Sequence, residues 1–179
     1  MADIGVYCAF ILGGTMSYEV VARPLRVAVL TVSDTRTLEN DKGGNKVQEF
    51  LEKANHIVAD RKIVIDDCDA IINAMTPWCN DVSIDVIIST GGTGIAMRDV
   101  TIEAVNSLYE KHIPGFGEIF RYLSYTEDIG TKAMASRAEA GVKNNTLMFS
   151  IPGSVGAVTL AMSKLIIPEM GHLVREITK

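Results

Sequence analysis

The chain has 179 residues, of which 47% are hydrophobic and 22% charged, with 15 glycines and 5 prolines. These values are typical of one globular domain and exclude a disordered chain, a collagen and a long coiled coil. The formal net charge of −5 argues against the basic surface of a nucleic-acid binder. Every apolar run is interrupted within about a dozen residues, fewer than the ~20 that span a bilayer, so we expect no membrane-spanning segment.

The cysteines and histidines form no recognisable metal or disulfide pattern. Cys8, Cys68 and Cys79 are odd in number and include no C-x-x-C pair, which argues against a secreted disulfide framework and a zinc knuckle. The three histidines lie far apart and form no H-E-x-x-H motif, so we interpret each as structural or surface-exposed. This cysteine usage favours a cytoplasmic protein.

Residues 1–24 differ in pattern from the rest of the chain. The stretch 6–12 is apolar, but Asp3 precedes it and no basic residue does, so it lacks the features of a secretory signal. We expect an N-terminal extension over 1–24 that is flexible or forms an edge strand. A single domain is expected over 25–179.

From residue 26 onward, predicted strands alternate with predicted helices. In chain order these are a strand over 26–32, a polar loop over 33–44, a helix around 47–54, a strand over 57–65, a helix over 70–75 and a strand over 84–90. The last third adds a strand over 146–151, a turn, and a helix from 155 with Ser154 as its N-cap. Since each parallel crossover requires a helix, this alternation predicts a three-layer α/β/α fold with a mostly parallel central sheet.

Ligands of parallel α/β sheets bind outside the carboxyl ends of the strands. Three predicted strand ends carry polar, small or acidic residues. They are followed by Ser33-Asp-Thr-Arg36 with Asp41-Lys-Gly-Gly44, by Asp66-Asp67, and by the segment 91–101. We therefore expect the functional site at this edge of the sheet.

The segment 91–101 carries the most specific pattern of the three. It begins Gly91-Gly92-Thr93-Gly94. Such glycines let the backbone approach a ligand closely, and the helix that follows offers free N–H groups to an anion. Arg98 can bind phosphate oxygens, whereas Asp99 repels a phosphate unless a cation lies between them. The pattern favours a phosphate held with Mg²⁺; the alternative is a tight turn in which Asp99 only caps the following helix.

Other segments leave two interpretations open. Asp66 and Asp67 either share a cation or form a solvated turn. Residues 114–118 predict a glycine-hinged loop before a helix, which places Glu118 in a first turn as a cap or a substrate contact.

No G-x-x-x-x-G-K-[ST] or G-x-G-x-x-G motif occurs, so a P-loop NTPase and a dinucleotide-binding dehydrogenase are not expected.

These motifs, in this order, resemble the MoaB/Mog family of molybdenum-cofactor biosynthesis proteins, and the MoaB branch most of all. The resemblance runs from about residue 26 to the C-terminus. It rests on Thr31-Val-Ser-Asp34, Gly91-Gly-Thr-Gly94, Arg98-Asp-Val-Thr101, Gly115-Phe-Gly-Glu118, Ser136-Arg137 and Pro152-Gly-Ser154. Each motif alone is weak, but their order and spacing are highly specific.

The resemblance implies a reaction and an assembly. Members with demonstrated catalysis adenylylate molybdopterin with Mg-ATP, and the family forms trimers or hexamers. The implied catalytic and Mg²⁺-binding acids are Asp99 and either Asp66 or Asp67. The implied substrate-binding residues are Ser33, Asp34, Gly91, Gly92, Thr93, Gly94, Arg98, Glu118, Ser136, Arg137, Pro152, Gly153 and Ser154. The alternative is a molybdopterin-binding carrier or scaffold of the same fold that transfers no AMP.

Overall fold

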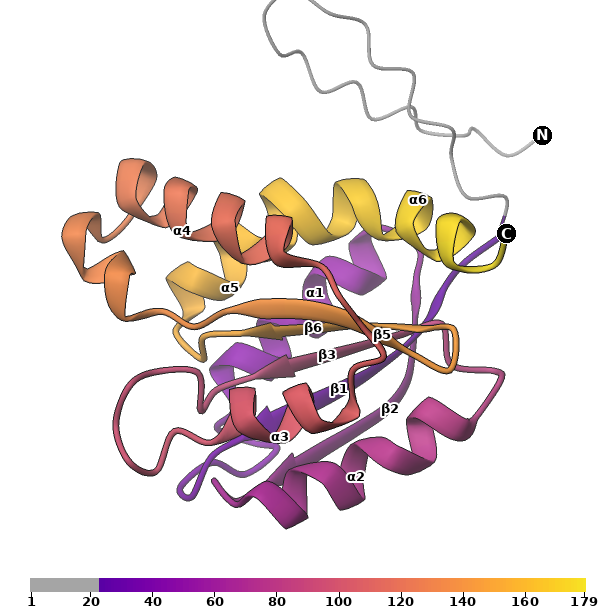
Figure 1. Ribbon diagram of the computed structural model, residues 1–179, viewed down its shortest axis with the longest axis horizontal. Helices are drawn as coiled ribbons and strands as arrows, with labels where there is room; N and C mark the ends of the chain where they lie inside the picture. The colour runs from indigo at the N-terminus through magenta and orange to yellow at the C-terminus, as the bar shows by residue number, and fades with distance from the viewer. Residues whose placement is uncertain (1–22) are drawn as a thin grey trace, which may run out of the picture.

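The computed structural model describes residues 23–179, so the expectation for residues 1–24 falls almost wholly outside the described part. Within that part, six strands form one sheet with helices on both faces (Figure 1). The strands are β1 (Arg26–Val32), β2 (Ile57–Val64), β3 (Val86–Thr90), β4 (Lys111–His112), β5 (Glu139–Lys143) and β6 (Thr146–Ile151). The α-helices are α1 (Lys42–Lys53), α2 (Cys68–Asn80), α3 (Thr101–Leu108), α4 (Pro114–Glu127), α5 (Val155–Ala161) and α6 (Ile167–Ile177).

The strand order is β2-β1-β3-β6-β5-β4. The pairs β1–β2, β1–β3 and β3–β6 are parallel, whereas β5 pairs antiparallel with both β6 and β4. The predicted three-layer α/β/α fold with a mostly parallel sheet is therefore confirmed. The predicted strands over 26–32 and 146–151 agree with β1 and β6, and the antiparallel edge formed by β4 and β5 was not predicted.

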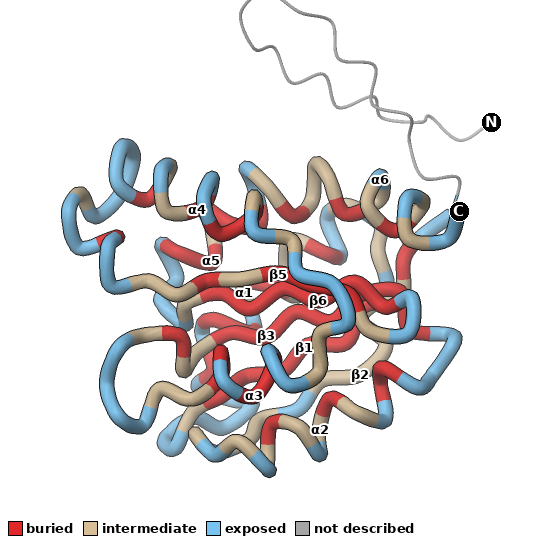
Figure 2. The backbone as a smooth tube through the Cα atoms, in the orientation of Figure 1, coloured by how far each residue is buried: buried red, intermediate tan, exposed pale blue. Residues whose placement is uncertain are grey.

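Both faces of the sheet are buried, which explains the continuous apolar sequence of its central strands (Figure 2). Side chains of β1 alternate between two cores, because successive residues of a strand point to opposite faces. Val27 and Val29 pack in the core beneath α1, α4, α5 and α6. Ala28 and Leu30 pack in the core beneath α2 and α3.

The C-terminal helix contains one wider turn. α5 continues through a π-helical turn (Met162–Ile166) into α6, whose first turn holds Pro168. A proline inside a regular helix lacks an N–H and clashes with the carbonyl four residues earlier, and a π turn relieves both problems. The stretch Val155–Ile177 has the length and composition of a membrane span, but 50% of its most apolar window is buried inside the domain, as in the core helices of soluble proteins.

Two sequence expectations about helix ends were wrong, and a third helix, expected with Pro77 and Trp78 near its end, is longer than expected. Residues 114–118 are not a loop but the start of α4, where Pro114 fits because the first turn of a helix needs no N–H donor. Glu118 accordingly lies beyond the first turn and is exposed. The polar loop expected over 33–44 ends at Asp41, since α1 begins at Lys42. The helix expected over 70–75 extends across Cys68–Asn80.

Candidate functional site

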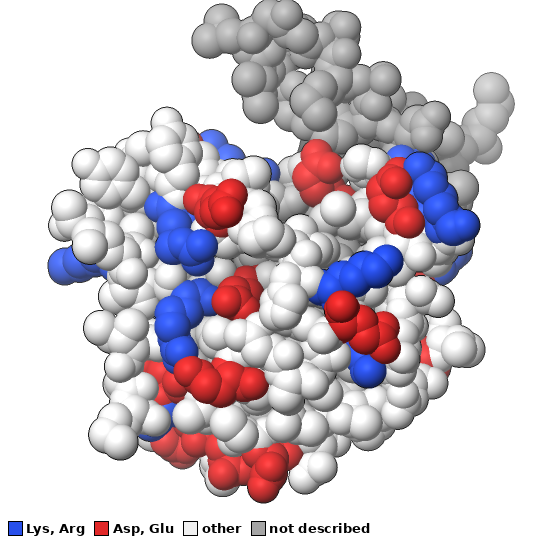
Figure 3. All heavy atoms as spheres, in the orientation of Figure 1, with Lys and Arg blue, Asp and Glu red and all other residues white. Residues whose placement is uncertain are grey.

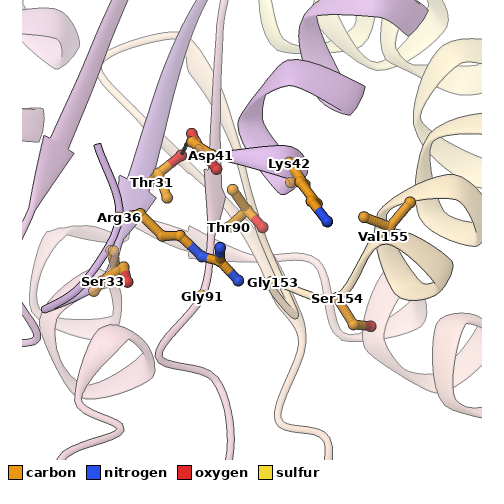
Figure 4. Close-up of a pocket in the computed structure, with 12 residues that line it drawn as sticks. Thr31, Ser33, Arg36, Asp41, Lys42, Thr90, Gly91, Gly153, Ser154 and Val155 are labelled. Carbon is orange, nitrogen blue, oxygen red and sulfur yellow. Dashed lines mark hydrogen bonds between the residues drawn. The ribbon is translucent and has the colours of Figure 1, made fainter. Parts of the chain in front are cut away.

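The carboxyl ends of β1, β3 and β6 meet at one edge of the sheet, where the loops that follow them enclose a cavity of about 250 Å³ (Figure 4). Its walls are Thr31, Val32, Ser33, Arg36, Asp41, Lys42, Gly43, Thr90, Gly91, Gly153, Ser154 and Val155. The edge at which the functional site was expected thus carries a cavity.

Two helix N-termini border this cavity. α1 begins at Lys42 and α5 at Val155, and both residues line the walls. Ser154 caps α5 by accepting a 3.2 Å hydrogen bond from the N–H of Ala157, as predicted. The side chains of Arg36 and Lys42 extend toward the same space in Figure 4. Helix N-termini and cationic side chains both favour anions, so the cavity is suited to a phosphate group.

Asp41 fixes the start of α1. Its buried carboxylate accepts hydrogen bonds from Thr31 Oγ1 at 2.6 Å, from the N–H of Gly44 at 2.9 Å and from Arg61 Nη2 at 2.8 Å. Burial alone would raise the pKa of Asp41, but these hydrogen bonds and the charge of Arg61 outweigh it and hold the pKa below its ordinary value. The ionised carboxylate therefore ties α1 to β1 and β2.

Arg36, Asp41 and Lys42 were not predicted as individual site residues. The acidic residue three positions before Gly44 is an N-cap signal that could have indicated the helix start at Lys42. The segment Asp41-Lys-Gly-Gly44 was assigned to this edge as a polar loop, and with the helix placed correctly Lys42 would have been recognised as its first residue.

The glycine segment makes a tight turn against β1. Gly91 and Gly92 have φ values of 102° and 62°, a region that favours glycine. A Cβ atom on Gly91 would lie 2.2 Å from the carbonyl oxygen of Val32. Thr101 closes the segment, since its hydroxyl donates to the Gly91 carbonyl at 2.9 Å and its N–H to the Gly92 carbonyl at 3.0 Å. The turn brings the loop over 93–99 back to the sheet edge.

The structure gives three acidic residues different surroundings. Asp67 is the N-cap of α2, and its carboxylate accepts from the N–H of Ala70 at 2.8 Å. Asp66 instead lies beside the glycine turn, because a Cβ on Gly92 would be 2.8 Å from its Oδ1. Asp99 does not cap α3, which contradicts that alternative; its carboxylate accepts from the N–H of Ala96 at 2.8 Å within the loop.

Asp66 is influenced electrostatically by Asp34 and Asp99. Burial raises the pKa of Asp66, the negative charges of Asp34 and Asp99 raise it further, and Arg98 partly offsets them. The N–H of Asp66 donates to Asp34 Oδ1 at 3.2 Å. The negative charges of Asp34 and Asp99 therefore disfavour the ionised form of Asp66, and a nearby cation would relieve this repulsion.

The carboxylates of this region are compatible with one kind of Mg²⁺ site, in which the substrate also binds the ion. Within residues 23–179, no three His, Cys, Asp or Glu side chains converge as an all-protein metal site. Mg²⁺ in phosphate-transfer enzymes is commonly held by one or two carboxylates together with waters and substrate phosphates. Asp66 and Asp99 can supply that number of protein ligands.

A second cavity of about 190 Å³ adjoins the first and shares Ser154 with it. Its walls are Thr93, Gly94, Phe120, Ser124, Asp128, Ile129, Lys132, Ala135, Ser136, Pro152, Ser154 and Ala157. The side of the molecule drawn in Figure 3 carries interspersed acidic and basic side chains over its described part. An anionic ligand would thus be held by local groups of the two cavities.

The candidate residues from the sequence divide into two groups. Seven line a cavity wall besides the shared Ser154, namely Ser33, Gly91, Thr93, Gly94, Ser136, Pro152 and Gly153. The others lie outside both walls, namely Asp34, Asp66, Asp67, Gly92, Arg98, Asp99, Glu118 and Arg137. Asp34, Arg98 and Asp99 nonetheless act electrostatically on Asp66, which lies beside Gly92, whereas Glu118 of α4 is exposed to solvent.

Comparison with known proteins shows the family of the chain. A family model described as "Probable molybdopterin binding domain" matches residues 28–172. "Molybdenum cofactor biosynthesis protein B" of Bacillus subtilis is 57% identical over 155 residues, which cover 87% of this chain and 91% of that protein. The chain belongs to the MoaB/Mog family. The protein of the same name from Staphylococcus carnosus is 57% identical over 159 residues, covering 88% and 93%.

Solved structures of the MoaB/Mog family share the fold. A crystal structure of molybdenum cofactor biosynthesis protein B superposes with a TM-score of 0.85 and 49% identity, covering 87% of this chain and 97% of that one. The tungsten cofactor synthesizing protein MoaB from Pyrococcus furiosus gives a TM-score of 0.77 and 35% identity, covering 88% and 99%. The recognition of the MoaB branch from sequence motifs is therefore confirmed.

Proposed function

We propose that this protein acts in molybdenum cofactor biosynthesis by adenylylating molybdopterin with Mg-ATP. The observation that carries the proposal is the juxtaposition of two opposite features at one sheet edge. Two helix N-termini with Arg36 and Lys42 form an anion-binding wall, and the carboxylates of Asp66 and Asp99 lie near the glycine turn beside it. Membership of the MoaB/Mog family supports the pterin substrate.

The anion-binding wall would hold phosphate groups of the substrates. The N–H groups at the starts of α1 and α5 donate to phosphate oxygens, and Lys42 and Arg36 neutralise their charge. Ser154 borders both cavities. Two adjoining cavities with a shared wall suit a reaction that brings two anionic substrates together.

The transfer itself requires alignment more than proton removal. The terminal phosphate of molybdopterin has a second pKa of about 6, so it is largely dianionic at neutral pH. Its oxygen attacks the α-phosphorus of ATP, a new P–O–P linkage forms, and pyrophosphate leaves with the electron pair of the broken bond. Because no general base is needed, positioning and charge neutralisation account for the catalysis.

Asp66 and Asp99 would hold Mg²⁺, which supplies neutralisation of the ATP phosphate charge when bound. The surroundings of the Asp66–Asp67 pair support Asp66 as the functional acid. Asp67 is engaged in capping α2, whereas Asp66 lies near Asp34 and Asp99. We also propose a cytoplasmic homotrimer or homohexamer, which would cover exposed apolar side chains of α4 such as Ile119 and Tyr122.

AMP transfer is the decisive experiment. Purified protein, molybdopterin and Mg-ATP are incubated, and the adenylylated pterin is separated by chromatography. We expect a product that depends on Mg²⁺ and a rate reduced at least 100-fold in Asp66→Asn and in Asp99→Asn. Asp67→Asn is the matched control, because asparagine caps helices as well as aspartate does, and it should retain the wild-type rate.

Two outcomes would contradict the proposal. Absence of product with tightly bound molybdopterin would establish the carrier alternative. Full activity in Asp66→Asn with loss in Asp67→Asn would transfer the acidic role to the residue that caps α2.

A further inference from the structure

Arg137 lies outside both cavities although its motif is associated with substrate binding. Its Nε donates to the carbonyl of Gly94 at 2.7 Å and its Nη2 to the carbonyl of Asp99 at 2.6 Å. Nη1 and Nη2 also donate to the carboxylate of Glu103. The main-chain N–H of Arg137 donates to the carbonyl of Thr93 at 3.1 Å. All three guanidinium nitrogens are therefore engaged within the protein.

We propose that Arg137 and Glu103 are positioning residues that fix the loop over 93–99 and thereby set the place of the Asp99 carboxylate relative to Asp66. This inference rests on the proposed function, in which Asp66 and Asp99 act together. It assigns Arg137 to the loop and not to a substrate phosphate, and it gives Glu103 a role that its sequence position did not suggest.

The loop has little else to hold it. Its tip residues Ile95 and Met97 are 76% and 101% exposed, so side-chain packing does not fix the tip. Ala96 and Asp99 bond to each other, through Ala96 N–H to Asp99 Oδ2 at 2.8 Å and Asp99 N–H to the Ala96 carbonyl at 2.9 Å. These bonds define the shape of the tip but not its position. Arg137 anchors the loop because it binds carbonyls on both sides of that tip.

Arginine is suited to this task by its planar fork of donors, which reaches several acceptors at once. Glu103 lies in the first turn of α3 and orients the guanidinium. The hydrogen bond from Arg137 lowers the pKa of Glu103, so the carboxylate remains ionised at neutral pH. Arg137 also follows Ser136 directly, and Ser136 lines the second cavity. The anchor thus links the wall of that cavity to the loop that carries Asp99.

Trypsin cleavage after Arg98 measures the anchoring without any enzymatic assay. Arg98 is exposed at the loop tip, and trypsin requires the chain around its target to detach locally. We expect cleavage after Arg98 to be at least tenfold faster in Arg137→Gln than in the wild type. Arg137→Lys should also be cut faster, because an ammonium group cannot replace the fork. Glu103→Gln should give an intermediate rate, since the bonds to Gly94 and Asp99 remain.

Arg121→Gln is the matched control. Arg121 donates to the carbonyl of Ala138 at 3.1 Å; Ala138 follows Arg137 in the sequence and is not part of the loop. Its removal should leave cleavage after Arg98 within twofold of the wild type. Equal cleavage in Arg137→Gln and wild type would overturn the proposal, and so would an equal acceleration in Arg121→Gln.

Kinetics separate positioning from substrate binding. In Arg137→Gln we expect a kcat at least tenfold lower and a higher half-saturating Mg²⁺ concentration, with the KM for molybdopterin within twofold. A raised KM with unchanged kcat would show that Arg137 binds substrate instead. If the wild type transfers no AMP, the cleavage experiment still decides whether Arg137 anchors the loop, so failure of the proposed function and failure of this inference are distinguishable.

Discussion

Arg61 extends from β2 to the start of α1, where its Nη2 lies 2.8 Å from Oδ2 of the buried Asp41. The two side chains are 14% and 2% exposed, respectively. Removing one partner of a buried ion pair leaves the other uncompensated and costs about 3 kcal/mol. We expect Asp41→Ala to lower the free energy of unfolding by about that amount, measured by urea denaturation at pH 7. A loss below ~0.5 kcal/mol would show that Arg61 finds another partner.

The same pair predicts a pH dependence. The pKa of Asp41 is lower in the folded protein than in the unfolded chain, whose value is about 3.9. The stabilisation from Asp41 is therefore complete above that value and is lost as the pH falls through the folded pKa. The stability difference between wild type and Asp41→Asn should accordingly be constant from pH 6 to 8 and shrink below about pH 4. A difference that grows in acid would contradict this assignment.

Asp66 should change the pH dependence of stability in the opposite direction to Asp41. Its folded pKa is raised by burial and by Asp34 and Asp99, so its ionisation destabilises the folded protein as the pH rises above about 3.9. Asp66→Asn removes this repulsion. We expect it to gain up to about 1 kcal/mol at pH 7, since solvent screens the charges, while AMP transfer is lost. Calorimetry should show a higher Tm at pH 7 and a smaller gain at pH 4; a lower Tm would mean that the carboxylate is structurally required.

The glycine turn predicts a sharp difference between two alanine substitutions. Gly91 has φ 102° and no room for a Cβ beside the Val32 carbonyl, so Gly91→Ala should destabilise by at least about 2 kcal/mol. A Cβ on Gly115 would meet no atom within 4 Å. Because alanine is a better helix former, Gly115→Ala in α4 should be neutral or gain up to about 1 kcal/mol. Chemical denaturation of both variants checks the contrast, which equal effects would disprove.

Lys42 should contribute to anion binding and Lys46 should not. Both belong to α1, but Lys42 lines the first cavity, whereas Lys46 forms an ion pair with Glu49 at 2.9 Å. We expect Lys42→Ala to weaken ATP binding about tenfold, the effect of one charge-assisted hydrogen bond. Lys46→Ala should stay within twofold. Titration calorimetry at two salt concentrations tests both variants, and equal affinities would remove Lys42 from the site.

Part of the fold could not be predicted from local patterns. β4 has only two residues, both exposed, so it carries no apolar signal. The ring of Tyr109 covers β5 at Gly141. A Cβ atom on Gly141 would lie 2.5 Å from the nearest atoms of that ring. The apolar group that covers this strand therefore comes from another part of the chain. One local signal was present in the sequence, the pair Asn144-Asn145 between the two strands. Both residues have positive φ values, 49° and 66°, which are typical of tight hairpin turns.

Part of the candidate site likewise could not be predicted from local sequence patterns. The ends of β1, β3 and β6 could be assigned to one edge because parallel strands place their carboxyl ends together, and this led to Ser33, Gly91 and Ser154. The role of Arg137 could not be predicted in this way. Its side-chain partners Gly94, Asp99 and Glu103 lie 34 to 43 residues earlier in the chain, and only the folded protein brings them together.

The π-helical turn has a consequence for the register of α6. Along α5, the π-helical turn and α6, the residues that face the sheet recur every fourth position, at Val158, Met162, Ile166, Met170 and Val174. In a regular α-helix four residues turn about 400°, so such a stripe would wind away by about 40° at each step. The π-helical turn contains one additional residue, and this returns the apolar stripe toward the sheet. If the same residues formed a regular α-helix there, Met170 and Val174 would be rotated about 100° out of the core, although every side chain of α6 itself would be unchanged.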